Sequence, residues 1–309
     1  MQVHKDLEQL PVFRNAVVTI GTFDGVHLGH RQVIDRLKAQ AAAINGESVI
    51  ITFHPHPRKI VATGGPGIRL LNTLEEKLEL LLEAGVDHVV VVPFTGAFAS
   101  LHADEYINSF LVGRFHPHTV IIGYDHRFGR DRKGDYLLLE QYAVTCGYQL
   151  QEIPKHLLDD IGISSTRIRE ALLNGQPEKA NNLLGYEFFF SGLVVDGDKL
   201  GRQLGYPTAN LRVEDDEKLI PANGIYAVYA ATGHNAEPVK GMMSIGFRPT
   251  VNGTKRVIEV NLFDFNQDIY GQHLRVYVKK YLREEVKFDS LEELVRQIDQ
   301  DKLDSLEVL

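Results

Sequence analysis

The sequence predicts an α/β protein of two domains: an N-terminal doubly wound domain built on a parallel sheet, and a C-terminal small closed β-barrel followed by a terminal helix. Three observations predict this fold class. Short apolar runs rich in β-branched residues alternate with helical patterns as far as residue 153. A glycine-containing loop joins the first of these runs directly to a helix. Beyond residue 184, runs rich in Phe, Val, Tyr and Thr are bounded by glycine and asparagine, which is typical of an all-β domain.

The alternation in the N-terminal half predicts a parallel sheet with helices on both faces. Ligands of such folds bind beyond the carboxyl ends of the strands. The predicted strands are 16–20, 48–53, 88–93, 119–123 and 148–153, and the predicted helices lie near 31–43, 74–84, 103–111 and 136–146.

The pattern is interrupted at Asn174–Pro177, and a short helical stretch follows at 178–184. We therefore predict a first domain of residues 1–184 and a second of residues 185–309. A terminal helix is expected from Ser290, its N-cap, to about Lys302. The second domain has the strand count and spacing of a small closed barrel, with predicted strands 186–195, 208–213, 225–231, 239–245, 256–262 and 273–280.

Length and composition narrow the possible partners. With 309 residues, of which 44% are apolar, each of two domains can have its own core. The formal charge of -8 argues against a general nucleic-acid or anionic-membrane surface. Cys146 is the single cysteine, and the chain start lacks the features of a signal peptide. No apolar run is long enough to span a bilayer. We expect a cytoplasmic protein without nucleic-acid or membrane partners; the composition predicts no oligomeric state.

The loop Gly21–His30 reads Gly-Thr-Phe-Asp-Gly-Val-His-Leu-Gly-His. Its glycines allow close approach of a ligand, and the following helix offers unpaired N–H groups with a partial positive charge, as a phosphate site requires. His27 and His30 lie on one side of the first helical turn. Neither of the better-known phosphate-loop patterns is present, so a different nucleotide chemistry is indicated. The plainer alternatives are a helix cap or a metal pair, although a nearby third metal ligand is lacking.

This loop resembles the G-x-F-D-G-x-H-x-G-H signature of the nucleotidyltransferase superfamily, in the form carried by bacterial FMN adenylyltransferases. The resemblance implies that His27 and His30 steady the nucleotide phosphates while a phosphate attacks the α-phosphorus of ATP and pyrophosphate leaves. Such transfers are accelerated mainly by in-line positioning and charge stabilisation. The resemblance also implies that ATP is bound by Gly21, Phe23, Asp24 and Gly25.

A hydroxyl-rich segment, Ser164–Arg169, resembles the S-S-T-x-x-R element of the same family. The resemblance implies that Ser165 and Thr166 contact ATP phosphates and that Arg169 is catalytic, opposite the histidine motif. Hydroxyl groups also cap helices and arginines clamp phosphate oxygens. An ordinary capped surface helix is the alternative.

Two loops after predicted strands extend this resemblance. Thr52–Arg58 resembles the family's T-F-x-P-H-P-R stretch, which implies that the flavin phosphate pocket is shaped by His56, Pro57 and Arg58. Gly123–Gly129 resembles a G-x-N-F-x-F-G loop, but Asp125 and His126 replace an asparagine and an aromatic residue.

The most specific marker of the second half is Leu200–Asn210, which resembles the G-x-x-L-G-[FY]-P-T-A-N signature of riboflavin kinases. Thr208 and Asn210 point to one face of a strand, and their oxygens are hard ligands of the kind that Mg²⁺ accepts beside nucleotide phosphates. The resemblance implies that they hold the magnesium of bound ATP, and that Gly205 and Pro207 also bind ATP. A turn before a polar edge strand is the alternative.

Two more segments resemble the nucleotide side of that kinase. Pro221–Val228 resembles its N-G-[IV]-Y strand start, which implies that Gly224 and Tyr226 lie at ATP. Ser244–Val251 resembles its G-x-[NR]-P-T loop.

Glu259 stands among apolar strand residues, where a carboxylate is costly unless it is paired or used. Its segment resembles the kinase's E-x-x-L-x-D-F motif, which implies that Glu259 accepts the proton of the riboflavin 5′-hydroxyl as it attacks the γ-phosphate. Asn261 stands where histidine is common. Farther on, the resemblance of 283–288 to L-R-x-E-x-K-F implies that Arg283 and Glu285 bind flavin, a solvated charge run being the alternative.

Together the motifs resemble bifunctional bacterial riboflavin kinase/FMN adenylyltransferases over nearly the whole chain. The resemblance implies Mg²⁺-ATP, riboflavin and FMN as the small-molecule partners, with no tightly held organic cofactor. Two alternatives stay open at this point. One is another adenylyltransferase of the superfamily, acting on pantetheine phosphate or nicotinate mononucleotide and carrying an unrelated β domain. The other is a flavin-binding regulator that has kept only one activity.

Overall fold

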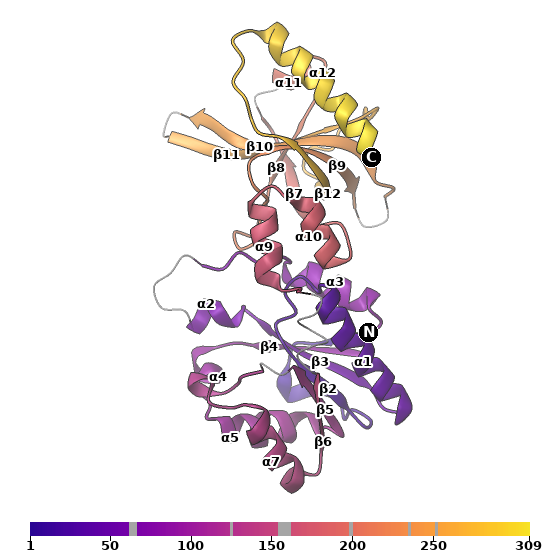
Figure 1. Ribbon diagram of the computed structural model, residues 1–309, viewed down its shortest axis with the longest axis vertical. Helices are drawn as coiled ribbons and strands as arrows, with labels where there is room; N and C mark the ends of the chain where they lie inside the picture. The colour runs from indigo at the N-terminus through magenta and orange to yellow at the C-terminus, as the bar shows by residue number, and fades with distance from the viewer. Residues whose placement is uncertain (62–66, 124–125, 154–161, 198–199, 234–235, 251–252) are drawn as a thin grey trace. The chain divides into compact units, whose positions relative to one another are not determined.

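The computed structural model describes residues 1–61, 67–123, 126–153, 162–197, 200–233, 236–250 and 253–309. The chain forms two compact units, Met1–Ser164 and Ser165–Leu309 (Figure 1). The first contains a parallel sheet and the second a closed barrel, so the predicted fold class is confirmed.

The sheet of the first unit has six strands, all parallel, in the order β1-β4-β3-β2-β5-β6. Five of them agree with the predicted strands to within one residue at each end. The sixth, β1, was not predicted because three residues at a sheet edge carry no periodic signal. The strands are β1 (Gln2–His4), β2 (Val17–Ile20), β3 (Ser48–His54), β4 (His88–Pro93), β5 (Thr119–Gly123) and β6 (Gln149–Ile153).

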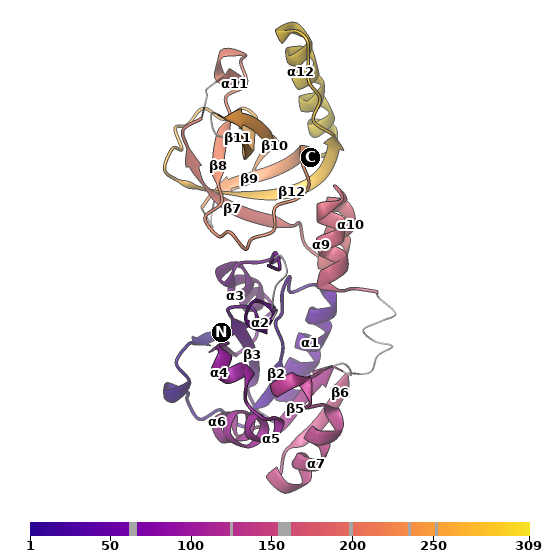
Figure 2. The same ribbon diagram turned by 90° about the vertical axis from the view of Figure 1, so that its left-hand side faces the viewer.

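Helices cover both faces of this sheet. Figure 2 shows α1 (Leu28–Ala43) on one side and α5 (Ala103–Glu105) and α6 (Gly113–Phe115) on the other. A π-helix, Tyr106–Val112, joins α5 to α6 and buries its aromatic rings against the sheet. The remaining helical elements among the described residues of this unit are η1 (Leu7–Gln9), α2 (Pro57–Val61), α3 (Leu74–Glu83), α4 (Gly96–Ala99), η3 (Arg130–Arg132) and α7 (Tyr136–Cys146).

The strand order reverses between β2 and β5. From β2 the chain continues through β3 to β4 on one side, whereas β5 and β6 lie on the other. At such a switch point the loops after the two central strands diverge and leave a crevice at the carboxyl edge of the sheet. The Gly21–His30 loop follows β2 at this edge, which is where the fold favours a nucleotide.

The second unit is a closed barrel in the order β10-β11-β8-β7-β12-β9, with every neighbouring pair antiparallel. Closure leaves no free sheet edge and buries alternate side chains inside. All six strands were predicted, and three of them, β10, β11 and β12, reach clearly farther than predicted. β10 and β11 pair up to Thr250 and Gly253, and β12 pairs with β9 as far as Arg283. The strands are β7 (Phe189–Val195), β8 (Ala209–Arg212), β9 (Gly224–Thr232), β10 (Val239–Thr250), β11 (Gly253–Leu262) and β12 (His273–Arg283).

In the described part of the second unit, four helices accompany the barrel. The terminal helix α12 (Leu291–Val308) packs against β9, β10 and β12. Ser290 is its N-cap, as predicted, and accepts from the backbone N–H of Glu293 at 3.2 Å. The helix continues six residues beyond the predicted end at Lys302. The other helices are α9 (Ser165–Leu173), α10 (Pro177–Leu184) and α11 (Leu200–Gln203).

Candidate functional site

The imidazole of His27 is the N-cap of α1. Its Nδ1 accepts a hydrogen bond from the backbone N–H of His30 at 3.3 Å, and the backbone of His27 is extended, as an N-cap requires. A ring nitrogen that accepts is unprotonated, so the proton of the neutral ring is on Nε2. The side chain therefore caps the helix while presenting its Nε2–H as a donor.

His30 stacks on His27 with ring centroids 3.6 Å apart and an interplanar angle of 13°. Its Nδ1 is shielded from solvent and has no hydrogen-bond partner among the described residues. Burial lowers the pKa of His30 well below its ordinary value, and the neighbouring His27 and Lys77 lower the pKa further. His30 is thus neutral at pH 7, and among the described residues its buried Nδ1 has no partner. Such an atom is costly unless a ligand satisfies it.

Phe23, Asp24 and Gly25 of the loop are buried and shape its turn. Phe23 is 3% exposed and has a positive φ of 49°, and Gly25 has a φ of 90°. Asp24 is also buried, and its carboxylate accepts from the backbone N–H groups of Leu71 at 2.9 Å and Asn72 at 3.3 Å. The predicted ATP ligand Asp24 therefore attaches the segment before α3 to the loop.

Lys77, which was not predicted from the sequence, is hydrogen-bonded to the Gly21–His30 loop. Its ammonium donates to the backbone carbonyl of Thr22 at 3.2 Å and to Oγ1 of Thr52 at 3.0 Å. The side chain is 7% exposed, and burial lowers the pKa of Lys77 to about 8, opposed by the charge of Asp24. The feature of the sequence that could have identified Lys77 is its place on the apolar face of α3, which also carries the buried Leu80 and Leu81.

The other residues predicted for nucleotide and flavin binding in the first half are partly exposed. His56 and Pro57 follow β3 at the carboxyl edge of the sheet, and Arg58 is exposed in the first turn of α2. His126 follows β5 and stacks on Phe128 with centroids 5.7 Å apart. Its Nε2 is buried without a partner in the described chain, and burial lowers the pKa of His126 to about 4. Asp125 lies outside the described residues.

The predicted triphosphate element occupies the first turns of α9. Ser165 and Arg169 are half-buried and Thr166 is exposed. This helix belongs to the compact unit that contains the barrel. Its predicted position opposite the histidine loop therefore stays a prediction.

In the barrel, the residues expected to bind metal and accept a proton lie on neighbouring strands. Asn210 of β8 is the direct register partner of Glu259 of β11 in an antiparallel pair. Directly opposed side chains of such a pair lie on the same face of the sheet, with Cβ atoms about 5 Å apart. Thr208 lies directly before β8, two residues from Asn210. Folding thus brings Asn210 and Glu259 together although they are 49 positions apart in the chain.

The residues at this edge fit a magnesium ion that arrives with a nucleotide. Thr208 and Asn210 offer neutral oxygen ligands, and a Cβ on Gly197 would meet the amide of Asn210 at 2.1 to 2.8 Å, so a glycine is needed beside this side chain. Within the described chain no group of three His, Cys, Asp or Glu residues is arranged to hold a metal by itself. Mg²⁺ is commonly bound through one or two protein ligands together with substrate phosphates, which suits this set.

Two contacts fix the loop that carries Thr208. Asn261 of β11, 6% exposed, donates from its amide to the carbonyl of Pro207 at 2.7 Å. Tyr206 donates to the carboxylate of Asp299 in α12, and this bond raises the pKa of Tyr206 to about 12. Gly205 has a positive φ of 86°, which a residue with a side chain rarely adopts.

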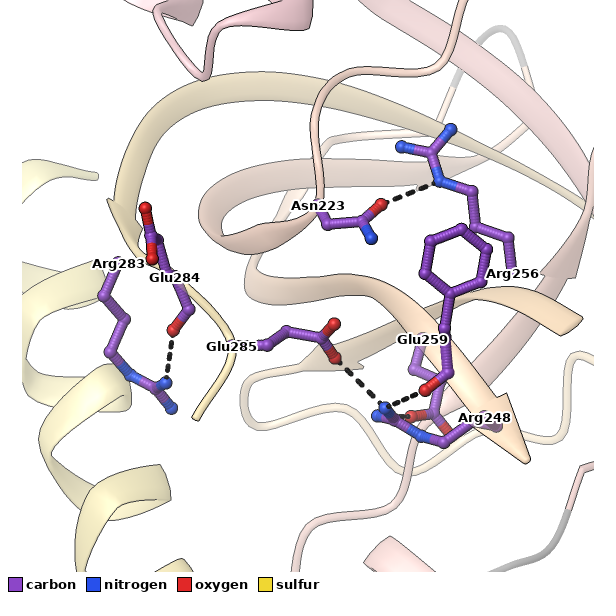
Figure 3. Close-up of polar contacts among 8 residues, drawn as sticks. Asn223, Arg248, Arg256, Glu259, Arg283, Glu284 and Glu285 are labelled. Atoms are coloured by element: carbon purple, nitrogen blue, oxygen red, sulfur yellow. Dashed lines mark hydrogen bonds and ion pairs between the residues drawn. The ribbon is translucent and has the colours of Figure 1, made fainter. Parts of the chain in front are cut away.

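Gly224 and Tyr226 occupy the base of the barrel instead of its surface. Tyr226 is fully buried and donates from its hydroxyl to the carbonyl of Ala222 at 2.7 Å. Gly224 has a φ of 145°, and a Cβ there would meet the ring of Tyr281 at 2.4 Å. The segment before it is held by a hydrogen bond from Nε of Arg256 to Asn223 at 2.9 Å, which Figure 3 shows.

The charged residues near Glu259 form two separate ion-pair groups. Arg248 of β10 contacts both Glu259, at 3.2 Å, and Glu285, at 3.0 Å (Figure 3). Arg283, in contrast, forms a two-pronged ion pair with Asp301 of α12, with N–O distances of 2.7 and 2.6 Å. Of the two predicted flavin-binding residues, Glu285 therefore faces the kinase residues and Arg283 ties the terminal helix to β12.

Two family models match the two halves of the chain. The family model for FAD synthetase matches residues 10–167, and the family model for riboflavin kinase matches residues 184–309. Together these two matches cover most of both compact units.

Curated relatives match over almost their full length. The bifunctional riboflavin kinase/FMN adenylyltransferase of Escherichia coli K12 is 39% identical over 302 residues, which cover 98% of this chain and 95% of that protein. The protein of the same name from Bacillus subtilis is 37% identical, with 94% of this chain and 92% of the relative covered.

A solved structure has the same architecture. The crystal structure of a protein named as a macrolide-efflux protein from Streptococcus pneumoniae superposes with a TM-score of 0.87 at 32% identity, and the match covers 97% of each chain. In the described part of the present chain, no helix combines the length and the apolar character that crossing a membrane requires. On the strength of both family models and of relatives aligned from end to end, the chain belongs to the bifunctional riboflavin kinase/FMN adenylyltransferase family.

Proposed function

We propose that this enzyme phosphorylates riboflavin with Mg²⁺-ATP in its barrel and adenylylates the resulting FMN in its N-terminal domain, residues 1–184, giving FAD and pyrophosphate. Family membership supports both reactions. The observation that carries the kinase assignment is the register pairing of Asn210 with Glu259, since it places a metal ligand beside a base.

For the adenylyl transfer, we assign His27 and His30 to the nucleotide phosphates. Both histidines belong to the loop that follows β2 at the switch point between β2 and β5, and in the described chain the buried Nδ1 of His30 has no hydrogen-bond partner. Helix capping and ring stacking already hold the two imidazoles in place. These groups therefore need little reorganisation when charge develops on the α-phosphate. Gly21 and Gly25 let the backbone approach the phosphates, while Phe23 and Asp24 hold the turn.

For the phosphoryl transfer, we assign the metal to Thr208 and Asn210 and the proton transfer to Glu259. Bound Mg²⁺ would neutralise charge on the β- and γ-phosphates of ATP. The Glu259 carboxylate would take the proton of the riboflavin 5′-hydroxyl, so that this oxygen forms the new bond to the γ-phosphorus as ADP leaves. Gly205 and Pro207 shape the loop that presents the metal ligands.

The other assignments complete the proposal. We assign Ser165, Thr166 and Arg169 to the triphosphate of the adenylyl donor, and His56, Pro57 and Arg58 to the flavin phosphate. We assign the functional boundary to residues 184/185, close to the start of the riboflavin kinase match at residue 184, although the compact units divide at Ser164/Ser165. A cytoplasmic location follows from the need of both reactions for ATP.

Product analysis tests the proposal. The purified chain is incubated with riboflavin and Mg²⁺-ATP, and flavins and nucleotides are separated by chromatography at successive times. FMN should accumulate first and FAD second, with pyrophosphate released in step with FAD, and chelation of the metal should stop both. Tight flavin binding without turnover would favour a regulator instead. Turnover of pantetheine phosphate or nicotinate mononucleotide, with nothing formed from riboflavin, would identify a different adenylyltransferase.

A further inference from the structure

Arg248 joins two carboxylates that come from different parts of the barrel. Its Nη1 donates to Glu285 at 3.0 Å and to the carbonyl of Phe247 at 3.4 Å, and its Nη2 donates to Glu259 at 3.2 Å. Glu259 is on β11, whereas Glu285 lies in the segment that follows β12. Figure 3 shows the guanidinium between the two acidic side chains. Because the fork of an arginine is planar and rigid, these two bonds fix the relative orientation of both carboxylates.

Gly246 allows this arrangement. The residue is buried two positions before Arg248, and a Cβ added there would lie 1.9 to 2.0 Å from the carboxylate atoms of Glu285. Glu285 therefore rests directly on the backbone of β10. From this position Glu285 accepts from Nη1 of Arg248, whose Nη2 donates to Glu259.

The geometry points to Arg248 and Glu285 as positioning residues for the kinase reaction that we propose above: Glu285 anchors the guanidinium, and the guanidinium holds the Glu259 carboxylate beside Asn210. The inference rests on the proposed role of Glu259 as the base. A base must lie about 3 Å from the hydroxyl that it deprotonates. Glu259 is 27% exposed and would otherwise sample several rotamers. A displacement of about 1 Å can cost on the order of 100-fold in rate.

In this inference Glu285 acts through Arg248 and does not bind flavin directly. A residue that binds flavin stabilises the enzyme–riboflavin complex, so its removal raises KM for riboflavin. A residue that acts through Arg248 on the base lowers kcat and leaves that KM nearly unchanged. Its effect also disappears when Arg248 is already gone, because the path to Glu259 is broken.

The test is a double-mutant cycle on the full-length enzyme, with kinase rates measured against riboflavin and ATP in turn. Arg248→Met should lower kcat for FMN formation about 100-fold, and Glu285→Gln should lower it about 10-fold, each with a riboflavin KM within about twofold of wild type. The double variant should be no slower than Arg248→Met alone. Arg248→Lys should regain part of the rate, since an ammonium keeps the charge but cannot bridge both acids.

Gly246→Ala tests the same contact in a second way, because it keeps both charged residues and displaces only the flexible end of Glu285. It should reproduce the kcat loss of Glu285→Gln. FAD formation from supplied FMN should stay at the wild-type rate in every variant, and thermal unfolding should show an intact barrel.

Three results would overturn the inference: additive losses in the double variant, a raised riboflavin KM at unchanged kcat, or wild-type kinetics in all variants. A wild-type enzyme that forms no FMN at all would instead refute the proposed kinase function, and the inference with it.

Discussion

Lys77 places a buried ammonium beside the Gly21–His30 loop, and this burial lowers the stability of the folded state. Its pKa of about 8 lies well below the ordinary 10.5 because burial disfavours the charged form. Each pH unit of such a shift corresponds to about 1.4 kcal/mol, so at neutral pH the charged ammonium costs the folded state about 3 kcal/mol. The hydrogen bonds to Thr22 and Thr52 offset part of that cost and hold the loop in shape.

Lys77 should therefore make the stability of the first unit depend on pH. Between about pH 8 and 10.5 the unfolded chain binds the lysine proton and the folded unit does not, so the free energy of unfolding rises with pH. Relative to Lys77→Met, the wild-type unit should gain thermal stability from pH 8 to pH 10. Calorimetry of the two proteins at pH 7, 8, 9 and 10 measures this difference, and a constant difference would contradict the buried ammonium.

At the scale of elements, the terminal helix α12 contacts two segments near the proposed kinase residues. Asp299 accepts from Tyr206 in the loop before the proposed metal ligands, and Asp301 pairs with Arg283 at the end of β12. Asp301 is 3% exposed, and Gln297 donates to it as well. The helix thus holds both segments with side chains rather than with sheet pairing.

Breaking the Asp301 pair should loosen this helix. Asp301→Asn keeps the shape and leaves the guanidinium of Arg283 without its counter-charge, which should cost about 2 kcal/mol because the pair is mostly buried. The barrel transition should shift down by about 5 °C. The kcat for FMN formation should fall, because the segment after β12 carries Glu285. Asp304→Asn, a change of the same kind three residues on in the same helix, is the control. An unchanged transition in Asp301→Asn would mean that packing alone holds α12.

At the scale of the whole molecule, the two sets of motifs do not divide at the boundary between the compact units. His30 lies in the sheet unit, and Glu259 lies in the barrel unit, which also contains Ser165, Thr166 and Arg169 of the adenylyltransferase motif. The chemistry assigned to His30 does not require Glu259, so the two activities should be separable by single substitutions.

Crossed substitutions check that separation. His30→Ala should lower FAD formation from supplied FMN by at least 100-fold, because a donor to the transferring group is lost. FMN formation should remain within about twofold of wild type in the same variant. Glu259→Ala should do the reverse, by a comparable factor for general-base loss. Each variant is the other's control, and parallel loss of both activities in either one would show that the reactions are not independent.

The sequence by itself determined the fold class and most of the elements. Apolar periodicity and glycine punctuation are local signals, so five sheet strands and six barrel strands could be predicted without coordinates. The motifs also placed Thr208, Asn210 and Glu259 in one candidate site. Signals of this kind are weakest for short pieces, and the three-residue β1 was missed for that reason.

Only the tertiary structure decided which side chains meet. The ion pairs of Arg248 with Glu259 and Glu285, and the contacts of Lys77 with Thr22 and Thr52, join residues 11 to 55 positions apart. It also showed that Tyr226 is a core residue and that Arg283 binds a helix. A local pattern reports the face on which a residue lies, whereas a charge pair depends on strand register and on the side chains that fold across it, which the chain acquires only when the barrel closes and the sheet packs.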